Sequence, residues 1–263
     1  MSQYIEILRK NGEYSCYHHN CYESRGKSIE SLIKQASDAL QLPQNFNLIV
    51  GTGDTPTYEY NFSTISKNFL KCFPCFLFDK WLEVGIGKYD FLINSFQNTA
   101  PDSSKIGWIG APMSFPRQKF CSQYGNSVFS EAIVNSWNRS DASNLHKNTT
   151  TYLTYQQQIN KWKYLIDFEG VGYSGRTKVL LNSPRIIFIV DRIYEEFWYE
   201  YLEPWVHFVP VKRDLSDLEE NYYKIENQPD LQNFIKQEQK QFAQKYLSVQ
   251  SSYKQIQLIV ENL

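Results

Sequence analysis

A glycine-rich loop that ends in an arginine is the segment of this sequence best suited to bind an anion. It covers residues 170–176 and reads Gly-Val-Gly-Tyr-Ser-Gly-Arg. Glycine permits positive φ values and close approach of the backbone to a ligand. A guanidinium, here Arg176, suits bidentate contact with a phosphate, and loop N–H groups at the start of a helix also favour an anion. Many glycine-rich loops only turn the chain, so Arg176 is what makes a nucleotide diphosphate the expected ligand.

The second candidate for chemistry is Asp54, in a turn over residues 51–56 that reads Gly-Thr-Gly-Asp-Thr-Pro. The turn follows the apolar run 46–50, which we expect to form a buried strand. Asp54 would then lie at the carboxyl edge of a sheet, where α/β proteins bind their ligands. A carboxylate there can accept a proton from a substrate. By itself, however, such an aspartate is more often an Asx turn or a helix cap.

A strand, a helix and a second strand must position the glycine-rich loop. The apolar segment 164–169 predicts a buried parallel strand, 177–181 a short helix, and 186–190 the next strand. Asn-Ser-Pro at 182–184 would end the helix. This βαβ unit and the alternation of strands and helices predict an α/β fold with mainly parallel sheets.

The rest of the chain has weaker patterns. We expect a helix over 27–41 with Ser28 as its cap, strands over 46–50, 76–78 and 106–110, a partly helical stretch over 122–147, a polar connector over 152–161 and a helical tail over 231–263.

Composition and charge restrict the classes of protein to which the chain can belong. With 263 residues and 31.0 kDa, it can bury one large core or two modest ones. A net charge of −1 and a pI near 6.4 argue against a nucleic-acid partner, which would need a strong basic excess. Aromatic residues make up 16% of the chain, which suits stacking on sugars but equally suits a packed core.

The sequence also predicts a cytoplasmic location with at most peripheral membrane contact. Charges interrupt residues 1–10, where a signal peptide would need an apolar run. No apolar run approaches the ~20 residues that span a bilayer. The last residues, 260–263, are not an endoplasmic-reticulum retention signal.

Five cysteines are an odd number, which in a cytoplasmic chain favours free thiols. Cys72 and Cys75 have redox-motif spacing, and together with Cys16, Cys21 and His18-His19 they could form a zinc site. These spacings fit no standard zinc module. The favoured interpretation is buried cysteines and a solvated Tyr-His-His turn at 17–19.

Two longer motifs of this sequence resemble glycosyltransferase family 90, the family of capsule-associated and protein O-glucosyltransferases. The first is the strand, loop and arginine over 163–178, with Lys178 two residues after Arg176. The second, over 204–216, reads Pro-Trp-Val-His-Phe-Val-Pro-Val-Lys-Arg-Asp-Leu-Ser. The resemblance covers roughly residues 45–225, and the expected location fits the shorter bacterial or viral members that build surface glycans.

The resemblance implies a role for each candidate site residue. In family members the aspartate that matches Asp54 is the catalytic base, and the strand expected at 74–78 resembles the one that follows it. Arg117 matches the last arginine of a motif that reaches the nucleotide, whereas Ala111 replaces a serine and Ile109 an arginine of that motif. Ala111 would therefore contact the donor through its backbone only. The resemblance places the UDP-sugar on Arg117 and on Val171, Gly172, Tyr173, Ser174, Gly175 and Arg176, with Ala111 and Lys178 as weaker contacts.

We therefore predict a GT-B-like α/β protein in which two Rossmann-like domains face a cleft. Residues 1–135 would form the acceptor-side domain with the base, and residues 136–263 the nucleotide-sugar domain with a C-terminal helix. The resemblance implies an inverting reaction that uses neither metal nor cofactor beyond its donor. A hexose or pentose would move from a UDP-sugar to a hydroxyl of a lipopolysaccharide, capsule or virion glycan. Asp54 would take the proton of that hydroxyl, while Arg117 and Arg176 stabilise the departing diphosphate.

Two alternatives stay open from the sequence alone. Asp167 and Glu169 form an acidic-x-acidic pair that could bind a cation in a metal-dependent transferase. Alternatively, the chain could be a non-catalytic module that binds a carbohydrate or nucleotide, although the presence of both Asp54 and Arg176 argues for an enzyme.

Overall fold

The computed structural model describes residues 3–82, 86–137, 147–148 and 152–263. The chain divides into two compact units, the first made of residues 1–92, 193–201 and 245–263 and the second of residues 93–192 and 202–244. Each unit therefore combines segments that are distant in the sequence. The domain boundary expected at residue 135 stays a prediction.

A four-stranded mixed sheet forms the first unit, in the order β2-β1-β3-β4. Its strands are β1 (Tyr4–Lys10), β2 (Glu13–His19), β3 (Phe46–Gly51) and β4 (Tyr60–Asn61). β1 pairs antiparallel with β2 and β3, whereas β3 pairs parallel with β4. The hairpin between β1 and β2 closes through Asn11 and Gly12, both at positive φ, as a type I′ turn requires. Residues 17–19, expected as a turn, are thus the end of a strand that the periodicity did not predict.

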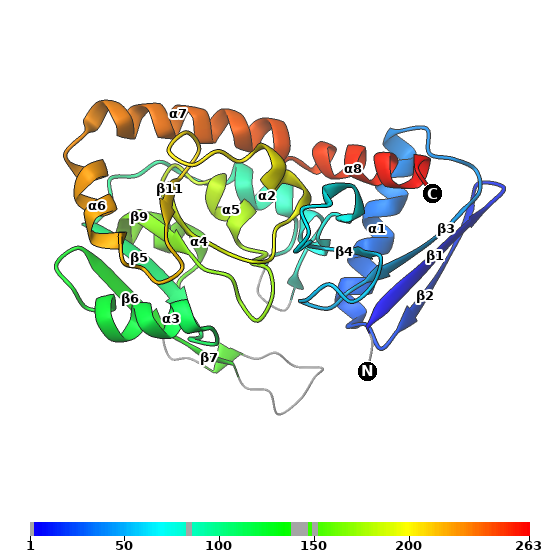
Figure 1. Ribbon diagram of the computed structural model, residues 1–263. Coiled ribbons are helices and arrows are strands. Elements are labelled where there is room, and N and C mark those ends of the chain that lie inside the picture. The colour runs from blue at the N-terminus through cyan, green and yellow to red at the C-terminus, as the bar shows by residue number, and fades with distance from the viewer. Residues whose placement is uncertain (1–2, 83–85, 138–146, 149–151) are drawn as a thin grey trace. The chain divides into compact units, whose positions relative to one another are not determined.

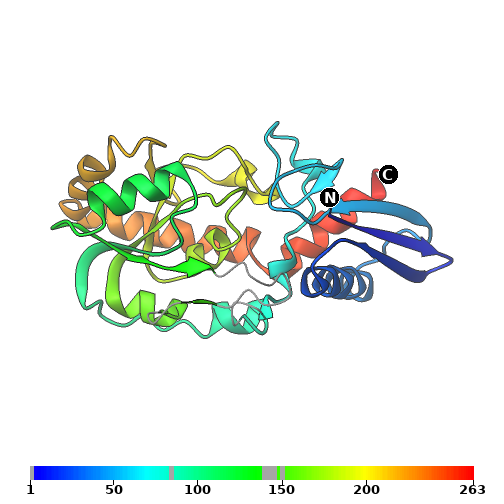
Figure 2. The ribbon, with the colours of Figure 1, turned by 90° about the horizontal axis from the view of Figure 1, so that it is seen from below.

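Helix α1 (Glu23–Ala39) packs in this unit, close to the helix expected over 27–41. Ile29, Leu32 and Ile33 are fully buried and follow the i, i+3, i+4 spacing of an apolar helix face. Helix α8 (Val249–Glu261) lies beside α1 (Figures 1 and 2). The unit also contains η1 (Phe69–Lys71), η2 (Phe76–Phe78), η5 (Phe197–Tyr201) and most of α2 (Tyr89–Asn94).

Residues Phe76–Phe78 form a 3₁₀ turn and not the expected strand. All three side chains are buried, so the run lacks both the alternation of a half-buried strand and a helical spacing. A short apolar run does not distinguish between these conformations. Here the tight turn brings three successive side chains into the core.

A five-stranded parallel sheet forms the second unit, in the order β11-β10-β9-β5-β6. Its strands are β5 (Ser103–Gly110), β6 (Ser130–Val134), β9 (Trp162–Asp167), β10 (Ile186–Val190) and β11 (Val209–Val211). The predicted βαβ unit is confirmed as β9, α5 (Thr177–Leu181) and β10. A small pair, β7 (Ser136–Trp137) with β8 (Lys147–Asn148), is antiparallel.

The two faces of the parallel sheet differ in what covers them. Tyr164 and Ile166 belong to a large apolar core. That core includes residues of α6 (Leu218–Glu226), α7 (Pro229–Tyr246) and η4 (Phe120–Tyr124), which follows α3 (Phe115–Lys119). Asp167 points to the opposite face, because side chains alternate along a strand, and there it meets Thr177 of α5. Figure 1 shows α7 running along this unit.

Three further expectations differ from the structure. Residues 152–161 are not a connector, because Tyr155–Lys161 forms helix α4 with a capping box between Thr154 and Gln157. The helical tail breaks between α7 and α8 at Leu247, and Ser248 caps α8. In the stretch 122–147, the helix ends at Tyr124 and strands follow, and residues 138–146 lie outside the described residues. The sequence pattern does not reveal α4, because its glutamines have helix propensity but form no apolar stripe.

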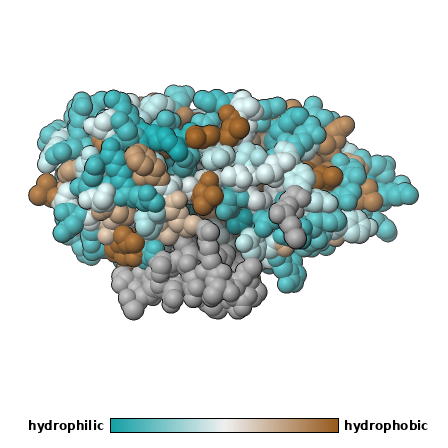
Figure 3. All heavy atoms as spheres, turned by 60° about the horizontal axis from the view of Figure 1, so that its bottom comes forward, coloured by the Kyte–Doolittle hydropathy of each residue, from teal (hydrophilic) through white to brown (hydrophobic). Residues whose placement is uncertain are grey.

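The α/β fold class, consistent with a GT-B-like protein, is confirmed by a parallel sheet of five strands and a second, mixed sheet. Mainly parallel pairing holds for the second unit, whereas two of the three pairings in the first are antiparallel. On the face shown in Figure 3, hydrophobic residues are scattered among hydrophilic ones, as is normal for a protein surface. Among the described residues, no helix combines the length and apolar character needed to cross a membrane.

Candidate functional site

The strand order of the second unit creates a topological switch point between β5 and β9. From β5 the chain continues to β6 on one side, and from β9 it continues to β10 and β11 on the other. Parallel α/β sheets bind ligands outside the carboxyl ends of the strands at such a point. Arg117 follows β5 and the loop 170–176 follows β9, so the structure brings these two predicted segments to one edge.

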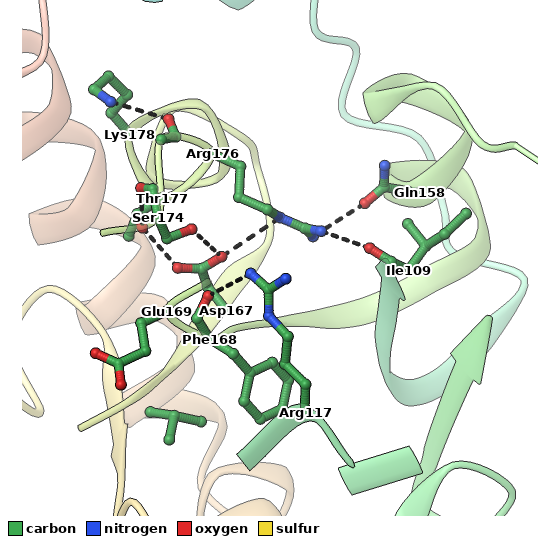
Figure 4. Close-up of polar contacts among 12 residues, drawn as sticks. Ile109, Arg117, Gln158, Asp167, Phe168, Glu169, Ser174, Arg176, Thr177 and Lys178 are labelled. Atoms are coloured by element: carbon green, nitrogen blue, oxygen red, sulfur yellow. Dashed lines mark hydrogen bonds and ion pairs between the residues drawn. The ribbon is translucent and has the colours of Figure 1, made fainter. Parts of the chain in front are cut away.

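Asp167, the last residue of β9, organises this edge (Figure 4). Its side chain is fully buried and accepts hydrogen bonds from Ser174 Oγ at 3.0 Å and Thr177 Oγ1 at 2.6 Å. Arg192 Nη1 lies 3.0 Å from Asp167 Oδ2, and Arg176 Nε lies 3.4 Å from Oδ1. Because a buried carboxylate is costly unless it is paired and hydrogen-bonded, this network fixes the C-terminal end of the loop to the strand.

Two predicted arginines cross the switch point and bind backbone carbonyls on both sides of it. Arg117 Nη2 donates to the carbonyl of Phe168 at 3.0 Å, and Nη1 donates to that of Ala111 at 3.3 Å. Arg176 Nη1 donates to the carbonyl of Ile109 at 2.7 Å, and Figure 4 shows the guanidinium reaching toward β5. The backbone of Ala111 is thus already engaged by Arg117. A guanidinium has five N–H donors, so these contacts leave donors for a ligand.

Burial strongly affects the pKa of Arg117. Desolvation lowers its pKa to about 10, and the nearby Arg176 and Arg192 act in the same direction, while Asp167 opposes them. The group therefore remains protonated at neutral pH. Its Nε is buried and has no hydrogen-bond partner among the described residues. An anion that reached this edge would relieve both the repulsion between guanidinium groups and the missing hydrogen bond.

Glu169, two residues after Asp167, is also paired with an arginine. Its side chain is almost fully buried and forms an ion pair with Arg213 Nη2. Arg213 follows β11, and its Nη1 is a second buried donor without a hydrogen-bond partner in the described part of the chain. The edge thus contains four guanidinium groups, on Arg117, Arg176, Arg192 and Arg213, and two carboxylates, on Asp167 and Glu169. Among these six groups, the positive charges outnumber the negative ones.

The glycine-rich loop contains backbone donors without protein acceptors, although it does not adopt the expected conformation. Gly12 is the only glycine at positive φ among the described residues, so the glycines at 170, 172 and 175 do not use the left-handed region. A Cβ on Gly170 would make only ordinary contacts, 3.7 Å from Arg117 Nη2. The backbone N–H groups of Val171, Gly172, Ser174 and Gly175 have no protein acceptor within the described ranges. Val171 is exposed and Gly175 is half-buried, so their N–H groups are the more accessible to an anion or to water, whereas Gly172 and Ser174 are buried.

The side chains of three predicted donor contacts are buried. Tyr173 and Ser174 are buried, and Ser174 is hydrogen-bonded to Asp167. Lys178 is fully buried, and its Nζ donates to the carbonyl of Gly175 at 3.0 Å. Figure 4 shows its side chain directed away from Asp167. The structure thus shows how Ser174 and Lys178 shape the loop, and their contact with a UDP-sugar stays a prediction.

Asp54 belongs to the first unit, in the loop that follows β3. Its side chain is 52% exposed, and its Oδ1 lies 3.1 Å from Nη1 of the buried Arg25. A side chain at Gly51, at the end of β3, would displace Asn61, since a Cβ there would lie 2.2 Å from Asn61 Oδ1. That Asn61 oxygen accepts hydrogen bonds from the backbone N–H groups of Thr57 and Tyr58, which fixes the far end of the loop.

All five cysteines are free thiols, as expected, and Cys72 and Cys75 are buried. Burial raises the pKa of Cys21 and of Cys121, so these thiols resist ionisation. Across the ranges that the structure describes, no group of three or more His, Cys, Asp or Glu residues is arranged to hold a metal ion.

Sequence reasoning missed three residues of these sites: Arg25, Arg192 and Arg213. Arg192 follows the buried run of β10 by two residues, so a charged residue at the carboxyl end of a strand was a usable signal. Arg213 lies inside the recognised 204–216 motif. Arg25 had no local signal, because it stands 29 positions before Asp54.

Comparison with known proteins finds similar sequences over parts of this chain. A family model described as Glycosyl transferase family 90 matches residues 35–261. Protein O-glucosyltransferase 1 of Rattus norvegicus is 39% identical over 89 residues, which are 34% of this chain and 23% of that protein. The human protein of the same name is 37% identical over 89 residues, with the same coverage of both chains. O-glucosyltransferase rumi of Drosophila melanogaster is 46% identical over 52 residues, or 20% of this chain and 13% of that protein. The matches thus span less than a quarter of these relatives.

Proposed function

Because this chain belongs to glycosyl transferase family 90, we propose that it is an inverting, metal-independent glycosyltransferase. It transfers a hexose or pentose from a UDP-sugar to a hydroxyl group of a surface glycan, such as lipopolysaccharide, capsule or a virion glycan. The relatives named above are O-glucosyltransferases, which favours glucose as the first donor sugar to test and xylose as the second.

The observation that carries this proposal is the surplus of guanidinium groups at the switch point. Four arginines face two carboxylates there, and Arg117 Nε and Arg213 Nη1 are buried without a hydrogen-bond partner among the described residues. Four loop N–H groups lack protein acceptors as well. A nucleoside diphosphate supplies the negative charge and the acceptor oxygens that this edge lacks.

The proposed reaction is a single displacement at the anomeric carbon of the donor. The acceptor oxygen forms a bond to that carbon while the bond to the UDP oxygen breaks, and UDP leaves with the electron pair. Asp54 accepts the proton of the attacking hydroxyl. Arg117, Arg176 and the loop N–H groups stabilise the charge that develops on the leaving diphosphate.

The pairing of the acidic residues supports the metal-independent choice. Asp167 is engaged by Arg192, Arg176 and two hydroxyl groups, and Glu169 is paired with Arg213. A divalent cation that used either carboxylate would have to displace a guanidinium group. Cations already occupy the positions that a metal-dependent transferase would reserve for its ion.

A screen of UDP release tests the proposal. Wild-type protein is incubated with UDP-glucose, UDP-xylose or UDP-galactose in excess EDTA, with UDP and the released sugar as readouts. We expect UDP release from at least one donor, and EDTA should not change it. NMR should show that the sugar anomer formed first is inverted relative to the donor. Loss of activity in EDTA that Mn²⁺ restores would favour the use of Asp167 and Glu169. UDP binding without turnover of any donor, with or without added acceptors, would favour a binding module. Absence of UDP binding would contradict the proposal.

A further inference from the structure

The loop that contains Asp54 has no regular secondary structure of its own. Residues 52–57 lie between β3 and β4 without a helix or strand. The loop is tied at its ends, where Thr52 N donates to the carbonyl of Gln3 at 2.9 Å and Thr57 N donates to Asn61 Oδ1 at 3.0 Å. Between these ties, the Asp54 side chain forms an ion pair with Arg25.

Arg25 is buried and has several contacts besides Asp54. It lies in the first turn of α1, and its side chain is 9% exposed. Its guanidinium carbon is 4.9 Å from the ring centroid of Phe76 and 5.2 Å from that of Tyr22, which are cation–π distances. Its Nη1 also donates to the carbonyl of Thr52 at 2.8 Å. One guanidinium thus joins the loop backbone, the Asp54 carboxylate and a helix.

We propose that Arg25 is a positioning residue that orients the carboxylate of Asp54 for proton abstraction, an inference that rests on the proposed function. The ion pair of Arg25 with Asp54 is made through Oδ1, at 3.1 Å. The second oxygen, Oδ2, has no hydrogen-bond or ion-pair partner in the described part of the chain, and the side chain is half exposed. Oδ2 is therefore the atom that accepts the proton. A base must lie within hydrogen-bond reach of that proton, and Arg25 removes the rotational freedom that would carry Oδ2 away.

A matched control is available in the same unit. Arg9 is also buried, donates to the carbonyls of Leu42 and Pro43, and stacks on Tyr14 at 4.9 Å. Substitution of Arg9 therefore removes a comparable set of contacts without touching the Asp54 loop. If Arg25 only stabilises the fold, Arg25→Met and Arg9→Met should have the same effect on the activity of the folded protein.

The first test compares these variants in UDP release from UDP-glucose. Arg25→Met should lower kcat about 10–100-fold, the scale expected when a reacting group is displaced by ~1 Å. The Kd for UDP should stay unchanged, and Arg9→Met should keep its kcat. Arg25→Lys retains the charge but not the planar fork, so it should restore part of the rate and serve as the test if Arg25→Met does not fold. Equal loss of kcat in Arg9→Met would overturn the inference.

The second test asks whether Arg25 acts through Asp54. In an Asp54→Asn background, adding Arg25→Met should change the remaining rate by less than about twofold, because residues that act as a unit are not additive. Multiplied losses would show that Arg25 acts independently. If Asp54→Asn is inactive but Arg25→Met has a normal rate, only the role of Arg25 is contradicted. If Asp54→Asn is fully active, the proposed base is contradicted.

Amide hydrogen exchange gives a readout that needs no turnover. In Arg25→Met, exchange in residues 52–57 should become faster, while in Arg9→Met it should match the wild type. Unchanged exchange in Arg25→Met would mean that the loop does not depend on Arg25, and the inference would fail even if donor turnover were absent.

Discussion

Asp167 and Asp54 are both paired with buried arginines, yet they differ in what their carboxylates can still do. The Asp167 side chain is 0% exposed, and both of its oxygens are bound by hydroxyl or guanidinium groups. The Asp54 side chain is 52% exposed, and only Oδ1 is bound. A carboxylate with both oxygens occupied organises structure, whereas one with a single bound oxygen is oriented and remains able to react. The pairing of an acid with an arginine therefore does not by itself identify its role.

The largest expected effect on catalysis comes from Asp54. Asp54→Asn keeps the shape of the side chain and a hydrogen-bond acceptor for Arg25 but removes the proton acceptor. Transfer should fall by about 10²–10⁴-fold, the usual contribution of a positioned base, while the melting temperature and the Kd for UDP stay nearly unchanged. The measurement is the rate ratio on the donor found by the UDP-release screen. Early melting with loss of UDP binding would show that Asp54 is a structural turn residue.

The largest expected effect on stability comes from Asp167. Asp167→Ala leaves the buried Arg192 without its carboxylate partner, which should lower the free energy of unfolding by about 3–5 kcal/mol. Asp54→Ala, the matched variant at the exposed carboxylate, should cost less than about 1 kcal/mol. Urea unfolding of both variants measures the contrast. Equal losses would remove the distinction between the two carboxylates.

Substitution of Arg176 tests the proposed contact with the diphosphate of the donor. Arg176→Ala should weaken UDP binding and lower the rate, with a loss of about 2–4 kcal/mol in transition-state stabilisation. Arg185 is the control, because it is buried in the same unit and donates to the carbonyls of Ile159 and Thr99 at the other end of β10. Arg185→Ala should lower stability without changing the Kd for UDP. Calorimetry that finds normal UDP binding in Arg176→Ala would exclude Arg176 as a diphosphate ligand.

The smallest expected effect is at Thr177, whose hydroxyl donates to Asp167 Oδ2 at 2.6 Å. Thr177→Val removes that donor from a buried carboxylate and should lower the free energy of unfolding by about 1–3 kcal/mol. Thr177→Ser keeps the hydroxyl and should retain most of the stability. A loss of the same size in Thr177→Ser would assign the effect to the methyl group instead of the hydrogen bond.

Local pattern was sufficient to predict the elements that hold the glycine-rich loop. The apolar runs of β9 and β10 and the Asn-Ser-Pro stop at 182–184 predicted the βαβ unit, and the structure confirms it. By contrast, three successive buried residues at 76–78 could not be assigned, and the polar face of α4 concealed a helix. Periodicity is informative only where one side of an element differs from the other.

The sequence by itself determined the two candidate segments for the proposed chemistry, which are the loop that ends at Arg176 and the turn that contains Asp54. Only the tertiary structure decided which charges meet, since Arg192 and Arg213 reach Asp167 and Glu169 through the strand order β11-β10-β9-β5-β6. It also decided that Arg25 faces Asp54 across 29 positions of sequence. The physical reason is that hydrophobic pattern and turn residues act over a few positions, whereas the partner of a charged side chain is set by how distant segments pack.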